Sequence, residues 1–235
     1  MQQTHLILMD IDGTMLVTGG VGVRAMELAG QDLFGPGFSS SGIDFAGRLD
    51  PILFNEMFAR EKMDASAEAH GRFRARYVAR LQALITQTPK ARALPGVPSL
   101  LEAIRRDQRC VLGLLTGNFA ETGSMKLRHC GIDPALFEIA VWGDESPHDP
   151  PLREHLPPVA MSRYAATRGR EINAGSVVVV GDTPHDIRCA GVHGCRSVGV
   201  ATGRFTTAEL RAAGADAVFA DLADTAAVMS VLAPG

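Results

Sequence analysis

The sequence predicts an α/β fold, in which an all-helical insertion interrupts a doubly wound, mainly parallel sheet after its first strand. Three observations support this prediction. An apolar run at residues 6–9 has the length and composition of a buried strand. Residues 17–92 contain no convincing strand but carry apolar side chains at helical spacing. From Leu94 onward, strand-like apolar runs alternate with helical segments, which is typical of a parallel sheet covered on both faces.

The insertion is expected to contain three helices. The first includes residues 24–29 and ends near Gly35, and the second begins where Asp50 serves as N-cap and Pro51 as first helical residue. The third carries apolar side chains four residues apart, which form one stripe: Phe73, Tyr77, Leu81 and Ile85.

The second part of the chain supplies the rest of the sheet. Helices are expected around residues 100–104, before Gly131, and at about 158–168, while five further strands are expected at 110–115, 139–142, 177–180, 197–200 and 217–219. The sequence therefore predicts an α/β core of residues 1–15 and 93–235 and a helical cap of residues 16–92. Hinges are expected near 16–20 and 94–96.

Composition narrows the range of partners and locations. The 235 residues are 46% hydrophobic and 21% charged, with a net charge of −3, so no nucleic-acid partner is expected. No apolar stretch approaches the roughly 20 residues needed to cross a bilayer, so no membrane partner is expected. Four cysteines without CxxC spacing favour reduced thiols in the cytoplasm. The sequence gives no prediction of oligomeric state.

Polar clusters directly follow three of the predicted strands. They are Asp10-Ile11-Asp12-Gly13-Thr14, Thr116-Gly117-Asn118, and the run from Gly181 through Asp182 to Asp186. The carboxyl ends of parallel strands lie at one edge of a sheet, where open α/β folds bind ligands. Each cluster alone resembles an ordinary turn. Their coincidence in this order predicts one shared site.

The first cluster already indicates its chemistry. Alternation along an extended chain points residues 10 and 12 to the same side. Two carboxylates held that close repel each other unless a cation or a shared proton intervenes. The pair Asp10 and Asp12 therefore indicates a metal site, or one acid that is kept protonated for catalysis.

Together the three clusters resemble the motifs of the haloacid dehalogenase-like superfamily, in its phosphatase branch. The resemblance covers nearly the whole chain, and the position of the helical insertion matches a small cap, as in the phosphoglycolate phosphatases. It implies a phosphatase that hydrolyses a small phosphorylated metabolite through an aspartyl-phosphate, with Mg2+ as cofactor.

The resemblance also assigns roles to individual residues. Asp10 corresponds to the nucleophile, Asp12 to the acid/base, and Thr116 to the hydroxyl residue of the second motif. The metal would be held by the Asp10 and Asp182 carboxylates and the Asp12 carbonyl, with Asp186 in support. The Thr116 hydroxyl and the backbone amides of the next two residues, Gly117 and Asn118, would bind phosphate oxygens.

The family has a further motif, its third along the chain, which is a lysine between the second and third clusters described above. This lysine is absent here. No lysine lies between Trp142 and Val177, where this motif belongs. Lys126 lies earlier in the chain, in the helix expected after the second motif, and is therefore not expected to take this role. The local candidates are Arg153 and His155. We favour Arg153, which is always charged and can donate two hydrogen bonds to a phosphate.

Some alternatives remain open at this stage. Arg48, in a loop of the insertion, either binds a distal anionic group of the substrate or is an ordinary surface arginine. A phosphomutase of the same superfamily would use the same motif residues. A carbon–halogen hydrolase is disfavoured by Asp12 and Asp182. A non-catalytic ligand-binding protein is supported only by the missing lysine.

Overall fold

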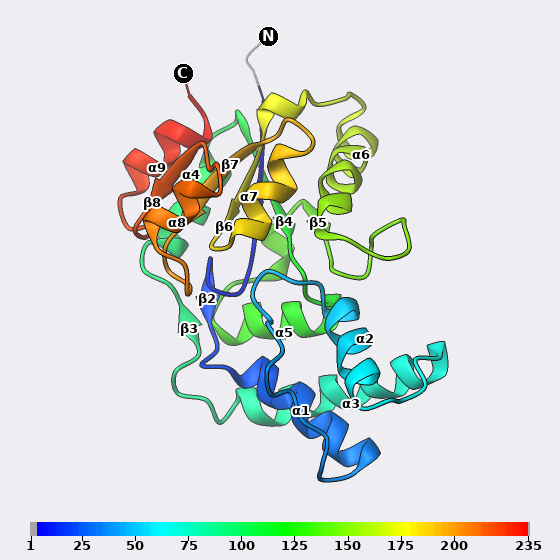
Figure 1. Cartoon of the computed structure of the whole chain (residues 1–235). Coiled ribbons are helices and arrows are strands. Elements are labelled where there is room, and N and C mark those ends of the chain that lie inside the picture. The colour runs from blue at the N-terminus through cyan, green and yellow to red at the C-terminus, as the bar shows by residue number, and fades with distance from the viewer. Residues whose placement is uncertain (1–3, 235) are drawn as a thin grey trace.

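A six-stranded parallel sheet forms the centre of the molecule, in the order β5-β4-β1-β6-β7-β8 (Figure 1). The computed structural model describes residues 4–234. Every strand pairing in this sheet is parallel, which confirms the predicted α/β class. The strands are β1 (His5–Met9), β4 (Cys110–Leu115), β5 (Ile139–Val141), β6 (Val177–Gly181), β7 (Arg196–Val200) and β8 (Ala217–Phe219).

The central position of β1 explains where the site forms. Leu8 of β1 lies beside Gly113 of β4 on one side and beside Val179 of β6 on the other. The chain runs from β1 to β4 and β5 on one side and then crosses to β6, β7 and β8 on the other, so the strand order reverses at β1. Open sheets bind ligands at such a reversal, beyond the carboxyl ends of the strands.

Helices cover both faces of the sheet, as apolar runs on both sides of each strand require. Ile7 and Met9 pack with α4 (Val97–Arg106), α9 (Thr225–Leu232) and part of α5 (Ala120–His129). Leu6 and Leu8 point the other way and pack with two further helices, α6 (Leu156–Arg168) and α7 (Pro184–Gly191). The remaining helical elements are α8 (Thr207–Ala212) and the short 3-10 helices η1 (Pro134–Leu136), η2 (Arg153–His155) and η3 (Ala174–Ser176).

The insertion forms a separate cluster of helices at the carboxyl-end edge of the sheet (Figure 1). It comprises α1 (Val21–Phe34), α2 (Asp50–Arg60) and α3 (Ala67–Ile85). All four residues of the predicted apolar stripe on α3 are buried in its core. Phe119, from the loop after β4, packs into the same core, with its ring centroid 5.2 Å from that of Phe54. The insertion is thus in direct contact with the loop of the second motif.

Two very short strands join the insertion to the sheet, where the sequence predicted none. Leu16–Val17 (β2) pairs antiparallel with Arg92–Ala93 (β3). A ladder of two residues is too short to give a periodic pattern, so the prediction that residues 17–92 contain no strand was wrong at its edges. We propose that the boundary between core and cap lies at this ladder.

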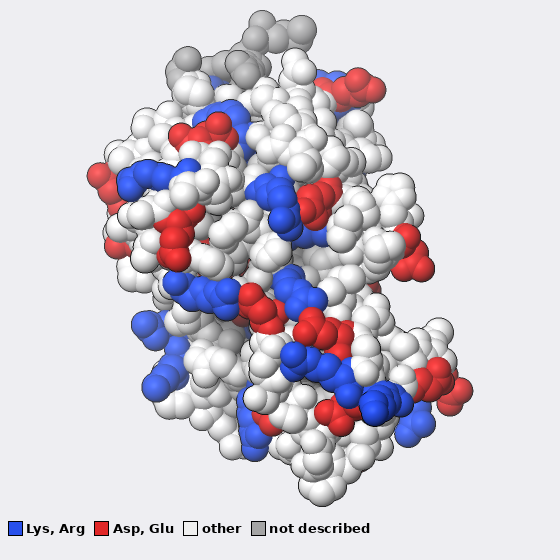
Figure 2. Space-filling model, in the orientation of Figure 1, with Lys and Arg blue, Asp and Glu red and all other residues white. Residues whose placement is uncertain are grey.

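Charges of both signs are interspersed over the face of the molecule in Figure 2, without a large area of one sign. Exposed ion pairs such as Arg204–Asp44 and Arg188–Glu154 contribute to this mixture. Within residues 4–234, no helix is both long and apolar enough to span a bilayer.

Candidate active site

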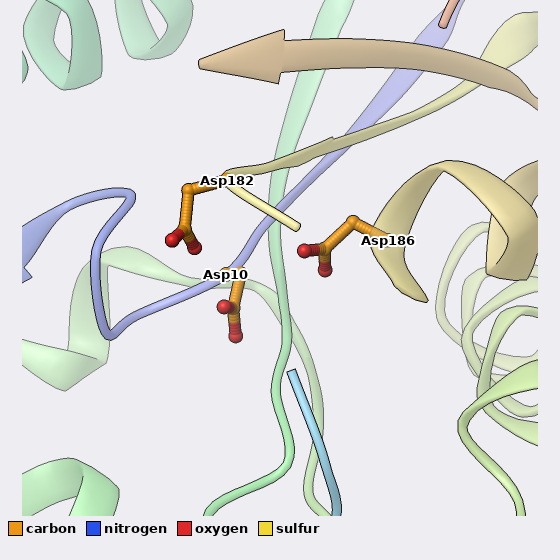
Figure 3. Close-up of side chains that lie close together, drawn as sticks. All are labelled: Asp10, Asp182 and Asp186. Carbon is orange, nitrogen blue, oxygen red and sulfur yellow. The ribbon is translucent and has the colours of Figure 1, made fainter. Parts of the chain in front are cut away.

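Three buried carboxylates converge at the carboxyl ends of β1 and β6 (Figure 3). Asp10 directly follows β1, Asp182 directly follows β6, and Asp186 lies in the first turn of α7. One oxygen atom from each carboxylate lies within 4.8 Å of the others. The structure therefore brings together residues from the first and third clusters, which are more than half the chain apart in sequence.

The backbone around Asp182 leaves no room for additional side-chain atoms. Gly13 has φ of +81°, and a Cβ atom placed on it would lie 2.4 Å from Asp182 Oδ2. A Cβ on Gly203, in the loop after β7, would lie 1.8 Å from the same oxygen. The Thr14 hydroxyl donates a hydrogen bond of 3.2 Å to the other oxygen, Oδ1. Glycine at both positions thus lets two loops close around one carboxylate.

Arg153 lies in the same buried cluster, where it contacts two of the carboxylates. Its Nη2 is 3.1 Å from Asp10 Oδ1 and 2.6 Å from Asp186 Oδ1. Burial alone would lower the pKa of Arg153, but the charges of Asp186 and Asp10 raise it, so the guanidinium stays cationic. Arg153 thus lies where the absent third-motif lysine was expected to act, and we propose that it takes that role. His155 contacts Ser146 instead, with Nδ1 2.7 Å from the hydroxyl.

The two oxygens of Asp186 are both engaged. Oδ1 accepts from Arg153, and Oδ2 accepts from the backbone amide and the hydroxyl of Thr183, at 3.1 and 2.7 Å. This Thr183–Asp186 pair is the capping box that begins α7. We therefore propose that Asp186 supports the site, as expected, and that Asp10 and Asp182 are the direct metal ligands.

Asp12 lies outside the carboxylate cluster, and its side chain faces a second polar group. Its Oδ2 is 2.7 Å from Lys126 Nζ and 2.9 Å from Asn118 Nδ2. Asn118 also accepts from Lys126 at 2.6 Å and donates to the Thr116 hydroxyl at 2.9 Å. Because the Asp12 side chain contacts Lys126 and Asn118, the metal ligand that we expect from Asp12 is its backbone carbonyl.

The sequence interpretation of Lys126 was wrong, because this lysine is buried in the site. Thr122 and Lys126 are one helical turn apart on α5, and this helix begins directly after the second cluster. A helix that starts at the site and has a lysine on its buried face was the signal that sequence analysis missed. The site thus contains two buried cations, of which Lys126 pairs with Asp12 and Arg153 pairs with Asp10.

Burial and mutual repulsion change the acidity of the cluster. Burial raises the pKa of the Asp10 carboxyl above its usual range, although Arg153 opposes the rise. Burial, reinforced by the charges of Asp186 and Asp10, raises the pKa of Asp182 to about 8. Asp182 therefore favours its protonated form at neutral pH unless a cation replaces the proton. A compact set of oxygen donors with this property suits a hard divalent cation such as Mg2+.

The insertion contacts the loop of the second motif through its backbone. The Asp50 amide donates to the Gly117 carbonyl at 2.8 Å, and the Phe119 amide donates to the Asp50 carboxylate at 3.1 Å. A Cβ on Gly117 would lie only 2.1 Å from the Arg48 carbonyl oxygen, so glycine permits this approach. The predicted N-cap role of Asp50 was wrong: Leu49 is the N-cap, and the Asp50 side chain bonds to the core instead.

We expect the Asp50 contact to depend on pH. Burial raises the pKa of Asp50 from 3.8 to about 7, although Lys126 opposes the rise. Because the folded pKa exceeds the unfolded one, this carboxyl lowers stability progressively as pH rises from about 4 to 7. Asp50→Asn removes that penalty. The free energy of unfolding of Asp50→Asn minus that of the wild type should therefore increase between pH 4.5 and pH 8, by at most about 4 kcal/mol.

Urea unfolding of both proteins at the two pH values measures this difference, in which the titration of all other groups cancels. Glu61→Gln, on the exposed end of α2, is the matched control and should show no such trend. A difference between Asp50→Asn and wild type that is constant with pH would contradict the expectation.

A cavity of about 570 Å³ opens between the carboxylate cluster and the insertion. The core contributes Asp10, Asp12, Asp182 and the second-motif residues, and the insertion contributes mainly apolar side chains. Arg48 also lines it, but its guanidinium is 2.6 Å from the Glu56 carboxylate. All predicted site residues except Asp186 therefore line one cavity, and Asp186 lies directly behind it.

Known proteins share this organisation. The model of the haloacid dehalogenase-like hydrolase family matches residues 7–191. The chain belongs to this family. A protein of Dickeya dadantii strain 3937, described as probable phosphatase IndB, is 28% identical to this hydrolase over 210 residues, which cover 88% of this chain and 86% of the other.

Solved structures match the hydrolase over nearly its whole length. A hydrolase from Pseudomonas syringae has a TM-score of 0.72 at 21% identity, covering 98% of this chain and 100% of its own. A predicted phosphoglycolate phosphatase from Haemophilus somnus 129pt has a TM-score of 0.70 at 21% identity, with coverages of 97% and 99%. CbbY from Rhodobacter sphaeroides, in complex with phosphate, has a TM-score of 0.67 at 19% identity, covering 94% of this chain and 96% of its own. These likenesses show the shared fold.

Proposed function

We propose that this hydrolase is a Mg2+-dependent phosphatase that acts on a small phosphorylated metabolite through an aspartyl-phosphate on Asp10. Membership of the family and the curated relative described as a phosphatase support the reaction class. The observation that carries the proposal is the convergence of Asp10, Asp182 and Arg153 beside a cavity bounded by Asp12.

The metal would be held by the carboxylates of Asp10 and Asp182 and the carbonyl of Asp12. When bound, Mg2+ would neutralise the charge of phosphate oxygens and of the carboxylates around it. The residues fit this role, because Asp182 has no cationic side chain within ion-pair distance among the described residues, whereas Asp10 and Asp186 share Arg153.

The first chemical step is attack on phosphorus by an Asp10 oxygen, in line with the leaving alcohol oxygen. The P–O bond to the alcohol breaks as the Asp10–phosphorus bond forms. Arg153, held by Asp186, fixes the orientation of Asp10 and supplies positive charge next to the transferred group. The Thr116 hydroxyl and the Gly117 and Asn118 amides would hydrogen-bond its oxygens.

The second step returns Asp10 to its free form. Asp12, which gave its proton to the leaving alcohol, now takes a proton from a water molecule, whose oxygen attacks the phosphorus while the bond between Asp10 and phosphorus breaks. Lys126 and Asn118 lie 2.7 and 2.9 Å from the Asp12 carboxylate and would orient this base. Inorganic phosphate and free alcohol are the products.

A screen of phosphorylated metabolites, scored by released phosphate, tests the proposal. With Mg2+ present we expect phosphate release, with EDTA we expect loss to background, and excess Mg2+ should restore it. Asp182→Asn should raise the Mg2+ concentration needed for half-maximal rate at least tenfold, since a ligand has lost its charge. Conversion of a sugar phosphate to its isomer without phosphate release would instead indicate a phosphomutase.

Lys126 offers a more specific prediction. Lys126→Met keeps the length of the side chain but removes the ammonium group that orients Asp12, so kcat should fall about 10- to 100-fold, with a smaller change in KM. Lys90→Met, at an exposed position, is the matched control and should retain the wild-type kcat. An unchanged kcat in Lys126→Met would show that Asp12 needs no such partner.

A further inference from the structure

The cavity wall opposite the carboxylates differs in character from the wall that would bind phosphate. Most of the insertion side chains that form it are apolar or aromatic, namely Val23, Met26, Ile43, Phe45, Leu53 and Tyr77, although Thr18, Asp44, Arg48 and Asp50 also line the cavity. The part of a substrate beyond its phosphate would therefore lie against hydrocarbon. Such a wall binds apolar groups and penalises charged ones, because a buried charge without a partner loses its hydration.

Each basic side chain that lines the cavity is already paired with a carboxylate. Two pairs involve the motif residues themselves, Lys126 with Asp12 and Arg153 with Asp10. The other two belong to the rim, with Arg48 at 2.6 Å from Glu56 and Arg204 at 2.8 Å from Asp44. Every cation that could bind a second anionic group of a substrate is thus already beside a carboxylate.

Tyr77 provides an uncharged polar group in this wall. It is fully buried and lines the cavity, and its hydroxyl lies beside the Thr122 side chain without a hydrogen bond of normal geometry to the residues that the structure describes. A Cβ on Gly22 would lie 3.7 Å from this hydroxyl and 3.4 Å from Lys126 Nζ, which places the hydroxyl close to Asp12's partner. A buried hydroxyl in this position is available to a ligand.

We infer that the leaving group of the substrate is an uncharged alcohol with a largely apolar body, and that the Tyr77 hydroxyl hydrogen-bonds to it. The inference rests on the proposed phosphatase activity and deepens it by naming the substrate class. This inference differs from the expectation that Arg48 binds a distal anion, because Arg48 already pairs with Glu56.

The charge preference is tested with two ligands of equal size. 4-Carbamoylbenzylphosphonate and 4-carboxybenzylphosphonate differ in one terminal group and in charge, and neither can be hydrolysed. Calorimetry with the Mg2+-loaded protein should show at least tenfold tighter binding of the carbamoyl compound. Equal or tighter binding of the carboxylate would overturn the inference, whether or not the protein releases phosphate from any ester.

Glu56→Gln provides the matched variant, because it frees Arg48 without changing the size of the side chain. In this variant the carboxylate ligand should gain affinity about three- to tenfold, while the carbamoyl ligand stays within twofold of its wild-type affinity. If both ligands respond equally, Arg48 is not held back by Glu56 and this part of the argument fails.

The role of Tyr77 is tested with monophosphates of straight-chain diols of three to six carbons, each compared with the alkyl phosphate of the same length. At one length the distal hydroxyl should raise kcat/KM about three- to tenfold, and Tyr77→Phe should remove that advantage. The assignment of Tyr77 would be overturned if the diol monophosphate kept its higher kcat/KM in Tyr77→Phe. It would also be overturned if no chain length showed a higher kcat/KM for the diol monophosphate than for the alkyl phosphate. Failure to release phosphate from any ester would instead overturn the proposed phosphatase activity.

Discussion

Asp10→Asn should lower the rate of phosphate release by a factor of at least about 10⁴, because the amide cannot form the covalent phosphoryl intermediate. The substitution keeps the size of the side chain and the place of its oxygen beside Arg153. Substrate affinity should change far less than kcat. Initial rates with Mg2+ and the best substrate of the metabolite screen measure the effect.

Two controls separate lost chemistry from lost structure. The thermal unfolding midpoint of Asp10→Asn should stay at or above that of the wild type without metal, since one of three clustered carboxylates has become neutral. Trapping with acid should yield a phosphorylated wild-type protein and an unmodified variant. A phosphorylated variant, or one with near wild-type rates, would rule out Asp10 as the nucleophile.

Arg153→Met should affect both activity and stability. Removing the cation leaves Asp10 and Asp186 buried without their shared partner, which typically costs about 3–5 kcal/mol for a buried pair. The rate should fall about 10²- to 10³-fold, because positive charge beside the transferred group is lost. The loss of stability should be largest at pH 8 and smaller at pH 5, where the remaining carboxylates can take up protons.

Arg153→Lys is the informative comparison, since it keeps the charge but not the guanidinium, in which Nη2 contacts both carboxylates and Nη1 donates to the Gly47 carbonyl. We expect it to recover most of the stability and to stay within about tenfold of the wild-type rate. Urea unfolding and steady-state kinetics on the two variants distinguish charge from geometry. If lysine performed no better than methionine, the shape of the guanidinium and not its charge alone would be essential in this chain.

Most of the fold was predictable because its elements are long and strongly patterned. The valine run of β6 and the four-residue spacing on α3 each have one structural interpretation. The two-residue strands β2 and β3 were not predictable, because pairing that short depends on where the rest of the chain brings Leu16 and Arg92.

The site was predictable where its residues directly follow strands, since parallel strands bring their carboxyl ends to one edge. Asp10, Thr116 and Asp182 belong to this group. Lys126 and Tyr77 were missed as site residues because they reach the cavity from helix interiors, where a buried lysine or tyrosine has the same sequence pattern as any helix face. The contact from Asp50 to Phe119 was hidden for a different reason: it joins the first residue of α2 to the residue before α5, and no sequence period relates the two.

The central place of β1 in the sheet has a consequence for how the chain assembles during synthesis. The strand that precedes Asp10 leaves the ribosome before both of its neighbours, which start only at Cys110 and Val177. The local contacts of the inserted helices can form meanwhile, as domains generally fold once their own residues have emerged. Until Val177–Gly181 emerges, an apolar ribbon with an open edge remains unprotected. Chaperones that shield nascent chains should therefore matter most to this protein during the interval before β6 emerges.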